Sequence, residues 1–144
     1  MHYIGEFFLN KIFWVSTFSC FLAQFLKVFT GEKKIDFTRI TISGGMPSSH
    51  SSFVSCMSMM IGFKYGFDSD IFAICAVLSC IVMYDASGVR QAVGKQATIL
   101  NKLVDSWQNR DMDPQERLKE LVGHTPKQVF WGAILGVLVA ILFY

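Results

Sequence analysis

Two histidines occupy matching places in this sequence, each just before or at the start of a long apolar segment. His50 lies in GGMPSSHSSF, residues 44–53, and His124 lies in GHTPKQ, residues 123–128. Serine or threonine beside proline is typical of a helix N-terminus, since the hydroxyl caps backbone N–H groups and proline lacks one. Unpaired N–H groups and the helix dipole favour an anion there. If the two ends face one another, they form a phosphate site.

The two motifs predict particular helix starts. In the first motif, we expect Ser43 or a nearby residue to cap a helix whose first turn is residues 47–50. In the second motif, we expect Thr125 to be the N-cap, Pro126 to lie in the first turn and Gln128 to complete a capping box. Each of the two helices would then open with a histidine.

Histidine suits the cleavage of a phosphate ester, because it can act as a nucleophile or as a general acid near neutral pH. Cleavage needs these two functions on opposite sides of phosphorus. Either motif alone is most often only a helix cap. Two such motifs, predicted at one membrane face and flanked by cations, favour a phosphate site with a histidine on each side.

The composition is that of an integral membrane protein. Of the 144 residues, 52% are hydrophobic, and the mean hydropathy is +0.41. A helix needs roughly 20 residues to cross the hydrocarbon. Apolar residues concentrate in four blocks, near residues 12–29, 51–67, 71–84 and 129–144. We therefore expect an all-α fold, an integral membrane helical bundle of about four transmembrane helices plus short cytoplasmic helices, in a single domain over residues 1–144.

The first apolar block could instead be a cleaved signal peptide, with Lys11 as its basic flank. The block is long, however, and it contains Gln24 and Lys27 near its end. It also lacks a small-x-small cleavage pattern. We expect it to be retained.

The cations predict the orientation in the membrane. With four crossings, only Lys11 and Lys64 fall on one side. The positive-inside rule then places the two basic loops in the cytoplasm and both termini outside, so the predicted site faces the cytoplasm. The cations of these two loops are Lys27, Lys33, Lys34 and Arg39 in the first, and Arg90, Lys95, Lys102, Arg110, Arg117, Lys119 and Lys127 in the second.

The mostly polar stretch at residues 91–123 has two halves. Apolar residues at helical spacing from Val89 to Val104 predict either an extension of the third crossing or a helix on the membrane surface. Further on, Asp113, Pro114 and Glu116 are typical of a helix start, which predicts a short cytoplasmic helix over residues 114–122.

The cysteines indicate neither disulfides nor zinc. All four lie inside apolar blocks, and no two form a C-x-x-C pair. The sequence offers no carboxylate cluster for a cation, so no metal or other cofactor is expected, and nucleic acid is not an expected partner. The cysteines are Cys20, Cys56, Cys75 and Cys80.

Three stretches together resemble a known family. They are GGMPSSHSS, VMYDASGVRQAVGKQATILNKL and VGHTPKQVFWGAILG. They are similar to the divergent branch of the type 2 phosphatidic acid phosphatase superfamily, related to acid phosphatases and vanadium-dependent haloperoxidases, from about Gln24 to Gly136. P-S-S-H resembles the P-S-G-H motif of that superfamily, and G-H-T-P-K-Q resembles the histidine end of S-R-x-x-x-x-x-H-x-x-x-D.

The resemblance implies roles for the site residues. His50 would protonate the leaving group, and His124 would attack phosphorus to form a phosphohistidine. Lysine and arginine hold the phosphate in the active relatives. The expected phosphate contacts here are Lys27, Arg90, Gly45, Ser48 and Ser49.

The chain departs from the active relatives beside the nucleophile. Gln128 stands where they have the aspartate that orients the nucleophilic histidine, and an amide cannot stabilise an imidazolium as a carboxylate does. Asp85 could take the place of that aspartate if the fold brings it near His124. The alternative is that Asp85 pairs with Arg90 or Lys27.

These features lead to three classes of function. The first is a hydrolase acting on a lipid phosphate, of the phosphatidic acid or polyprenyl phosphate type, with membrane lipids as surroundings. The second is a non-catalytic protein that binds or transports a lipid phosphate at the same site. The third is a structural membrane scaffold. Gly132 and Gly136 form a G-x-x-x-G that favours close packing within the bundle or a homo-oligomer.

Overall fold

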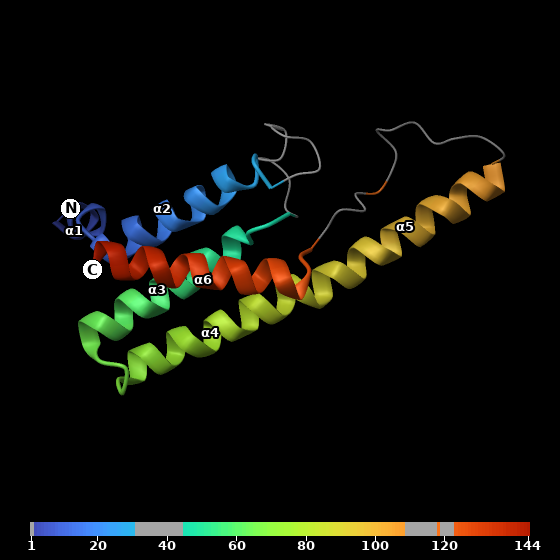
Figure 1. Ribbon diagram of the computed structural model, residues 1–144. Helices are drawn as coiled ribbons and strands as arrows, with labels where there is room; N and C mark the ends of the chain where they lie inside the picture. The colour runs from blue at the N-terminus through green and yellow to red at the C-terminus, as the bar shows by residue number, and fades with distance from the viewer. Residues whose placement is uncertain (1, 31–44, 109–117, 119–122) are drawn as a thin grey trace.

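The computed structural model describes residues 2–30, 45–108, 118 and 123–144, and these are helical apart from short connections (Figure 1). No strand is present in these ranges. The predicted all-α fold is confirmed. The helices are α1 (His2–Phe8), α2 (Lys11–Leu26), α3 (Ser49–Tyr65), α4 (Asp70–Ser87), α5 (Val89–Gln108) and α6 (Pro126–Phe143).

Helix α3 is the centre of the bundle, because it packs against α2, α4 and α6. The marked chain ends lie together at one end of the bundle (Figure 1). At the opposite end, four helix termini converge: the C-terminal ends of α2 and α4 and the N-terminal ends of α3 and α6. The two histidine motifs lie at these N-terminal ends.

Serines explain how a helix as polar as α3 occupies the centre. Its buried Ser52 hydroxyl lies 2.6 Å from the hydroxyl of Ser19 on α2. On another face of α3, the hydroxyl of Ser58 lies 2.7 Å from the hydroxyl of Ser79 on α4. Such bonds satisfy buried hydroxyls and join helices that have no hydrophobic drive to associate in lipid. The serines of α3 therefore hold the bundle together.

Helix α6 lies unusually close to α3 at its two glycines. A Cβ atom on Gly132 would lie 2.3 Å from the carbonyl oxygen of Ser48, and one on Gly136 would lie 2.3 Å from that of Ser52. Only glycine permits this approach. The G-x-x-x-G thus packs within the chain, and self-association through it stays a prediction.

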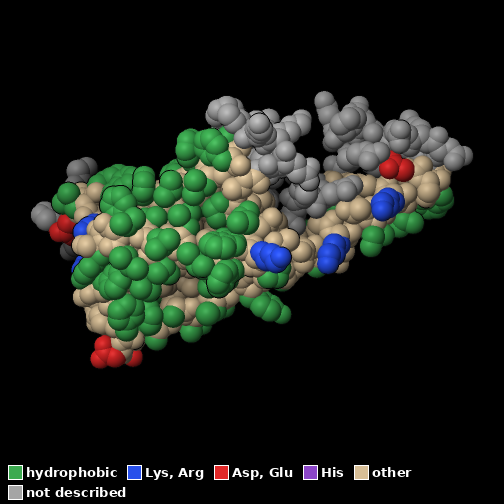
Figure 2. Space-filling model, viewed as in Figure 1, with side chains coloured by type: hydrophobic (Ala, Val, Ile, Leu, Met, Phe, Trp, Pro, Cys, Tyr) green, Lys and Arg blue, Asp and Glu red, His purple; other side chains and the backbone are tan. Residues whose placement is uncertain are grey.

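The surface of the bundle suits a membrane. Apolar side chains cover the face seen in Figure 2, whereas charged side chains gather at the ends and along α5. Two helical stretches are long and apolar enough to cross a membrane, Asp70–Trp107 and Pro126–Phe143, and Lys11–Leu26 is a shorter apolar helix. Four crossings remain a prediction.

Some boundaries differ from those expected. Helix α3 begins at Ser49 with Ser48 as its N-cap, so Pro47 precedes the helix and the predicted first turn was wrong. Helix α4 runs past Tyr84 to Ser87, and α5 continues it, as the extension alternative predicted. His2 lies in α1, which was not predicted. Ser43 and the helix predicted over residues 114–122 lie outside the described residues.

Candidate functional site

His124 is held at the start of α6 by contacts on both sides. The cap is as predicted: Thr125 is the N-cap, Pro126 begins the helix, and Gln128 completes the capping box. The backbone N–H of His124 donates to the carbonyl oxygen of Ala86 in the last turn of α4, at 2.9 Å. The residue is only 3% exposed. Its position is therefore fixed by α4 as well as by α6.

The His124 ring is oriented by a backbone carbonyl. Its Nδ1 lies 3.1 Å from the oxygen of Gly45. A carbonyl only accepts, so Nδ1 must carry the proton and Nε2 must carry the lone pair. Nε2 is buried and has no hydrogen-bond partner in the described part of the chain. Gly45 has φ +95°, a conformation that favours glycine, and this directs its carbonyl toward the ring.

The surroundings of His124 keep it neutral. Burial lowers its pKa first and the positive charge of Lys27 lowers it further, to about 4. The Gln128 side chain and the Gly45 carbonyl act in the opposite direction but are outweighed. At neutral pH the ring is therefore uncharged, with its lone pair on Nε2.

Lys27 ends α2 as its C-cap and is 1% exposed. Its Nζ has no hydrogen-bond partner among the described residues. The Lys27 side chain passes Gly45, because a Cβ atom on Gly45 would lie 3.7 Å from its Cδ. The carbonyl of the same glycine holds His124, so Lys27 and His124 both adjoin Gly45. A buried ammonium is costly unless it is paired with an anion. This pair of groups suits an anion such as phosphate.

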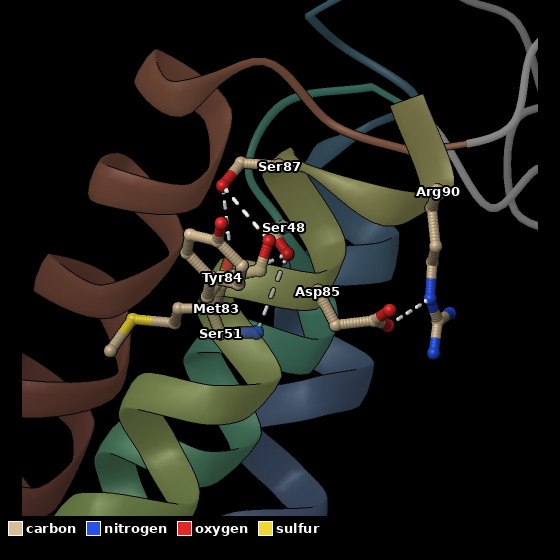
Figure 3. Close-up of polar contacts among 7 residues, drawn as sticks. All are labelled: Ser48, Ser51, Met83, Tyr84, Asp85, Ser87 and Arg90. Atoms are coloured by element: carbon tan, nitrogen blue, oxygen red, sulfur yellow. Dashed lines mark hydrogen bonds and ion pairs between the residues drawn. The ribbon is translucent and has the colours of Figure 1, made fainter. Parts of the chain in front are cut away.

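The start of α3 supports the site in a way that the sequence did not predict. The Ser48 hydroxyl accepts from the N–H of Ser51 at 3.3 Å and from its hydroxyl at 3.0 Å (Figure 3). The Ser48 N–H donates to the carbonyl of Gln128 at 3.0 Å. Ser48 thus joins the starts of α3 and α6, and its expected phosphate contact stays a prediction. Ser49 follows it, buried, and His50 is exposed.

Asp85 pairs with Arg90 and is not the group that orients His124. Its Oδ2 lies 2.6 Å from Arg90 Nε, in a half-exposed pair at the junction of α4 and α5 (Figure 3). Of the two alternatives open for Asp85, the structure supports the ion pair, because Nδ1 of His124 is engaged by Gly45 instead. Both charges of this pair act on His50. Arg90 therefore lies near the general-acid side of the site.

Gln128 is engaged in the cap, because its Oε1 accepts from the N–H of Thr125 at 3.0 Å. Its side chain raises the pKa of His124, but as a neutral amide it cannot offset a positive charge as a carboxylate does. The group missed in the sequence is the Gly45 carbonyl, because backbone atoms carry no residue signature. Within the described residues, no cluster of three His, Cys, Asp or Glu could hold a metal ion.

Comparison with known proteins assigns the chain to a family. A family model described as "Divergent PAP2 family" matches residues 8–139. The chain belongs to this family. It is also 40% identical over 134 residues to the "Uncharacterized membrane protein YuiD" of Bacillus subtilis (strain 168), an alignment that covers 83% of this chain and 85% of the relative. No solved structure matches the chain significantly. The divergent PAP2 family membership and the membrane location predicted from the sequence are confirmed.

Proposed function

We propose that this membrane protein hydrolyses a lipid phosphate, of the phosphatidic acid or polyprenyl phosphate type, through a phosphohistidine at His124. The observation that carries the proposal is the state of that ring. It is buried and neutral, it is held through Nδ1, its Nε2 has no hydrogen-bond partner among the described residues, and the positive charge of Lys27 acts on it. These are the requirements of a nitrogen nucleophile beside a phosphate-binding cation.

The reaction would run in two steps. Nε2 of His124 attacks phosphorus and forms a P–N bond while the P–O bond to the lipid breaks, and His50 gives a proton to the departing lipid oxygen. Water then gives a proton to His50 and attacks the phosphohistidine, so that the P–N bond breaks, inorganic phosphate leaves, and both histidines return to their starting states. Lys27 would offset charge on the phosphoryl oxygens in both steps. The Gly45 carbonyl would keep its bond to Nδ1–H throughout.

The second candidate is a non-catalytic protein that binds or transports a lipid phosphate. The specific observation in its favour is the neutral carbonyl behind His124. A carboxylate stabilises the positive charge that develops on a nucleophilic histidine, and a carbonyl does so less. Asp85, the one candidate to replace that carboxylate, is paired with Arg90.

The membrane side of the site is part of the proposal. The site lies at the end of the bundle opposite the marked chain ends (Figure 1). Lys27, Arg90 and Lys127 all belong to this end. By the positive-inside rule it faces the cytoplasm.

Phosphate release tests the proposal. The purified protein in detergent should release inorganic phosphate from phosphatidic acid or a polyprenyl phosphate in the absence of added metal. Each lipid's binding is measured in parallel. Tight binding of a lipid phosphate without release would instead establish the second candidate.

The pKa of His124 gives a second prediction. Because burial and Lys27 lower it to about 4, His124 should keep its nucleophilic form from pH 7 down to about pH 5 and lose it only near pH 4. An NMR titration of the ring, assigned with His124→Gln, measures this directly. Lys27→Met removes a charge that lowers the pKa, so the midpoint should rise. A midpoint near the ordinary histidine value of about 6.5 would contradict the buried, charge-coupled site.

A further inference from the structure

A crevice runs along α3 on the side away from α6. Helices α2 and α4 both pack on α3 but make no contact with each other within the described helices. They lie on either side of α3 and α6 in Figure 1. A cavity of about 370 Å³ lies here, within the usual range for small-molecule sites. Its walls include Phe13 and Ser16 of α2 and Ile71 of α4, and its floor includes Phe53, Met57 and Ile61 of α3.

The floor of this crevice lies on the same side of α3 as His50. At 3.6 residues per turn, His50, Phe53, Met57 and Ile61 fall in one row along α3. The opposite row of α3, which contains Ser52, is the one that α6 approaches. The proposed general acid is therefore the first member of the row that lines the crevice.

The crevice is long and apolar. Ile61 is eleven residues beyond His50, which corresponds to about 16 Å of helix. Phe53, Met57 and Ile61 are each only partly buried, so their apolar side chains are available to a ligand. At the far end the lining includes Phe7 of α1 and Tyr65. The lining thus runs from Phe53, one turn beyond His50, to α1.

We infer that this crevice binds a hydrocarbon chain of the lipid phosphate whose phosphate group lies at His124. The inference rests on the proposed function, because it takes the phosphate position from it. A chain that leaves the phosphate on the side of His50 would pass Phe53, Met57 and Ile61 in turn. A long chain can contact all three of these side chains, whereas a short chain ends near Phe53. The site should therefore prefer a long-chain phosphate over a short-chain one.

Met57→Trp tests the crevice, because an indole at the middle of the floor obstructs a long chain and leaves the histidines untouched. The readout is the ratio of kcat/KM for hexadecyl phosphate to that for butyl phosphate, with the protein in nanodiscs. The ratio should fall about tenfold. The matched control is Leu138→Trp, at a half-exposed position on α6, and it should leave the ratio within about twofold of wild type. Turnover of butyl phosphate by Met57→Trp shows that the variant is folded. If it is not folded, Ile61→Phe is used in its place.

The outcomes separate this inference from the proposed function. An unchanged ratio in Met57→Trp, or an equal fall in the control, overturns the crevice while leaving the hydrolase standing. If the wild type releases no phosphate from either compound, the proposed hydrolase function is wrong. The crevice is then tested by measuring the binding of hexadecyl phosphate by equilibrium dialysis. About tenfold weaker binding to Met57→Trp than to wild type then supports the crevice. Equal binding to both, or none, overturns it, and the cavity is then occupied only by bulk bilayer lipid.

Discussion

Replacing His124 by alanine is expected to lower phosphate release at least about a thousandfold on every lipid phosphate that the protein cleaves. The proposed reaction passes through a covalent bond to Nε2. Among the described residues, the other buried side-chain nitrogen without a hydrogen-bond partner is Nζ of Lys27. A charged ammonium is not a nucleophile. Loss of the imidazole therefore removes the nucleophile of the reaction, whereas loss of a phosphate-binding contact would only lower its rate.

The measurement has two parts. Steady-state phosphate release gives the rate, and acid quenching with radiolabelled substrate tests for phosphate that stays on the wild-type protein and is absent from His124→Ala. The matched control is His2→Ala, which removes a histidine from α1 at the other end of the bundle. Turnover that survives in His124→Ala would exclude the phosphohistidine mechanism.

The start of α6 shows what the sequence could predict. Its N-cap, proline and capping box involve residues within four positions of one another, so local chemistry decides them. The start of α3 was predicted too early, because Ser48 caps the helix through Ser51 and leaves Pro47 outside it. Several serines in a row offer competing caps, and only packing against Gln128 selects one.

The partners of the site residues needed the fold. His124 and Gly45 are 79 positions apart, and nothing local distinguishes the carbonyl that orients the ring. Asp85 and Arg90 are close in sequence, yet their pairing depends on how α5 continues α4 beyond Gly88. The residues of the site were therefore predictable by type, but the connections between them were not.

The second large effect is expected on stability, in Gly136→Leu. A Cβ at this position would lie 2.3 Å from the carbonyl oxygen of Ser52 and 2.9 Å from the N–H nitrogen of Cys56, both of which are backbone atoms that cannot rotate away. Helix α6 must then move off α3, at a cost of about 3 kcal/mol or more in the free energy of unfolding. Thermal unfolding in detergent, followed by circular dichroism, measures the loss.

Two comparisons make this result specific. Gly5→Leu is the matched control, because a Cβ on Gly5 meets nothing within 4 Å, and it should leave the unfolding midpoint nearly unchanged. An equal midpoint for Gly136→Leu and wild type would show that α6 does not pack on α3 through this glycine. His124→Ala should fold like wild type while losing activity. The scaffold alternative predicts a different result, in which Gly136→Leu loses function in cells and His124→Ala keeps it. A scaffold depends on the packing of α6 against α3 but not on the imidazole of His124.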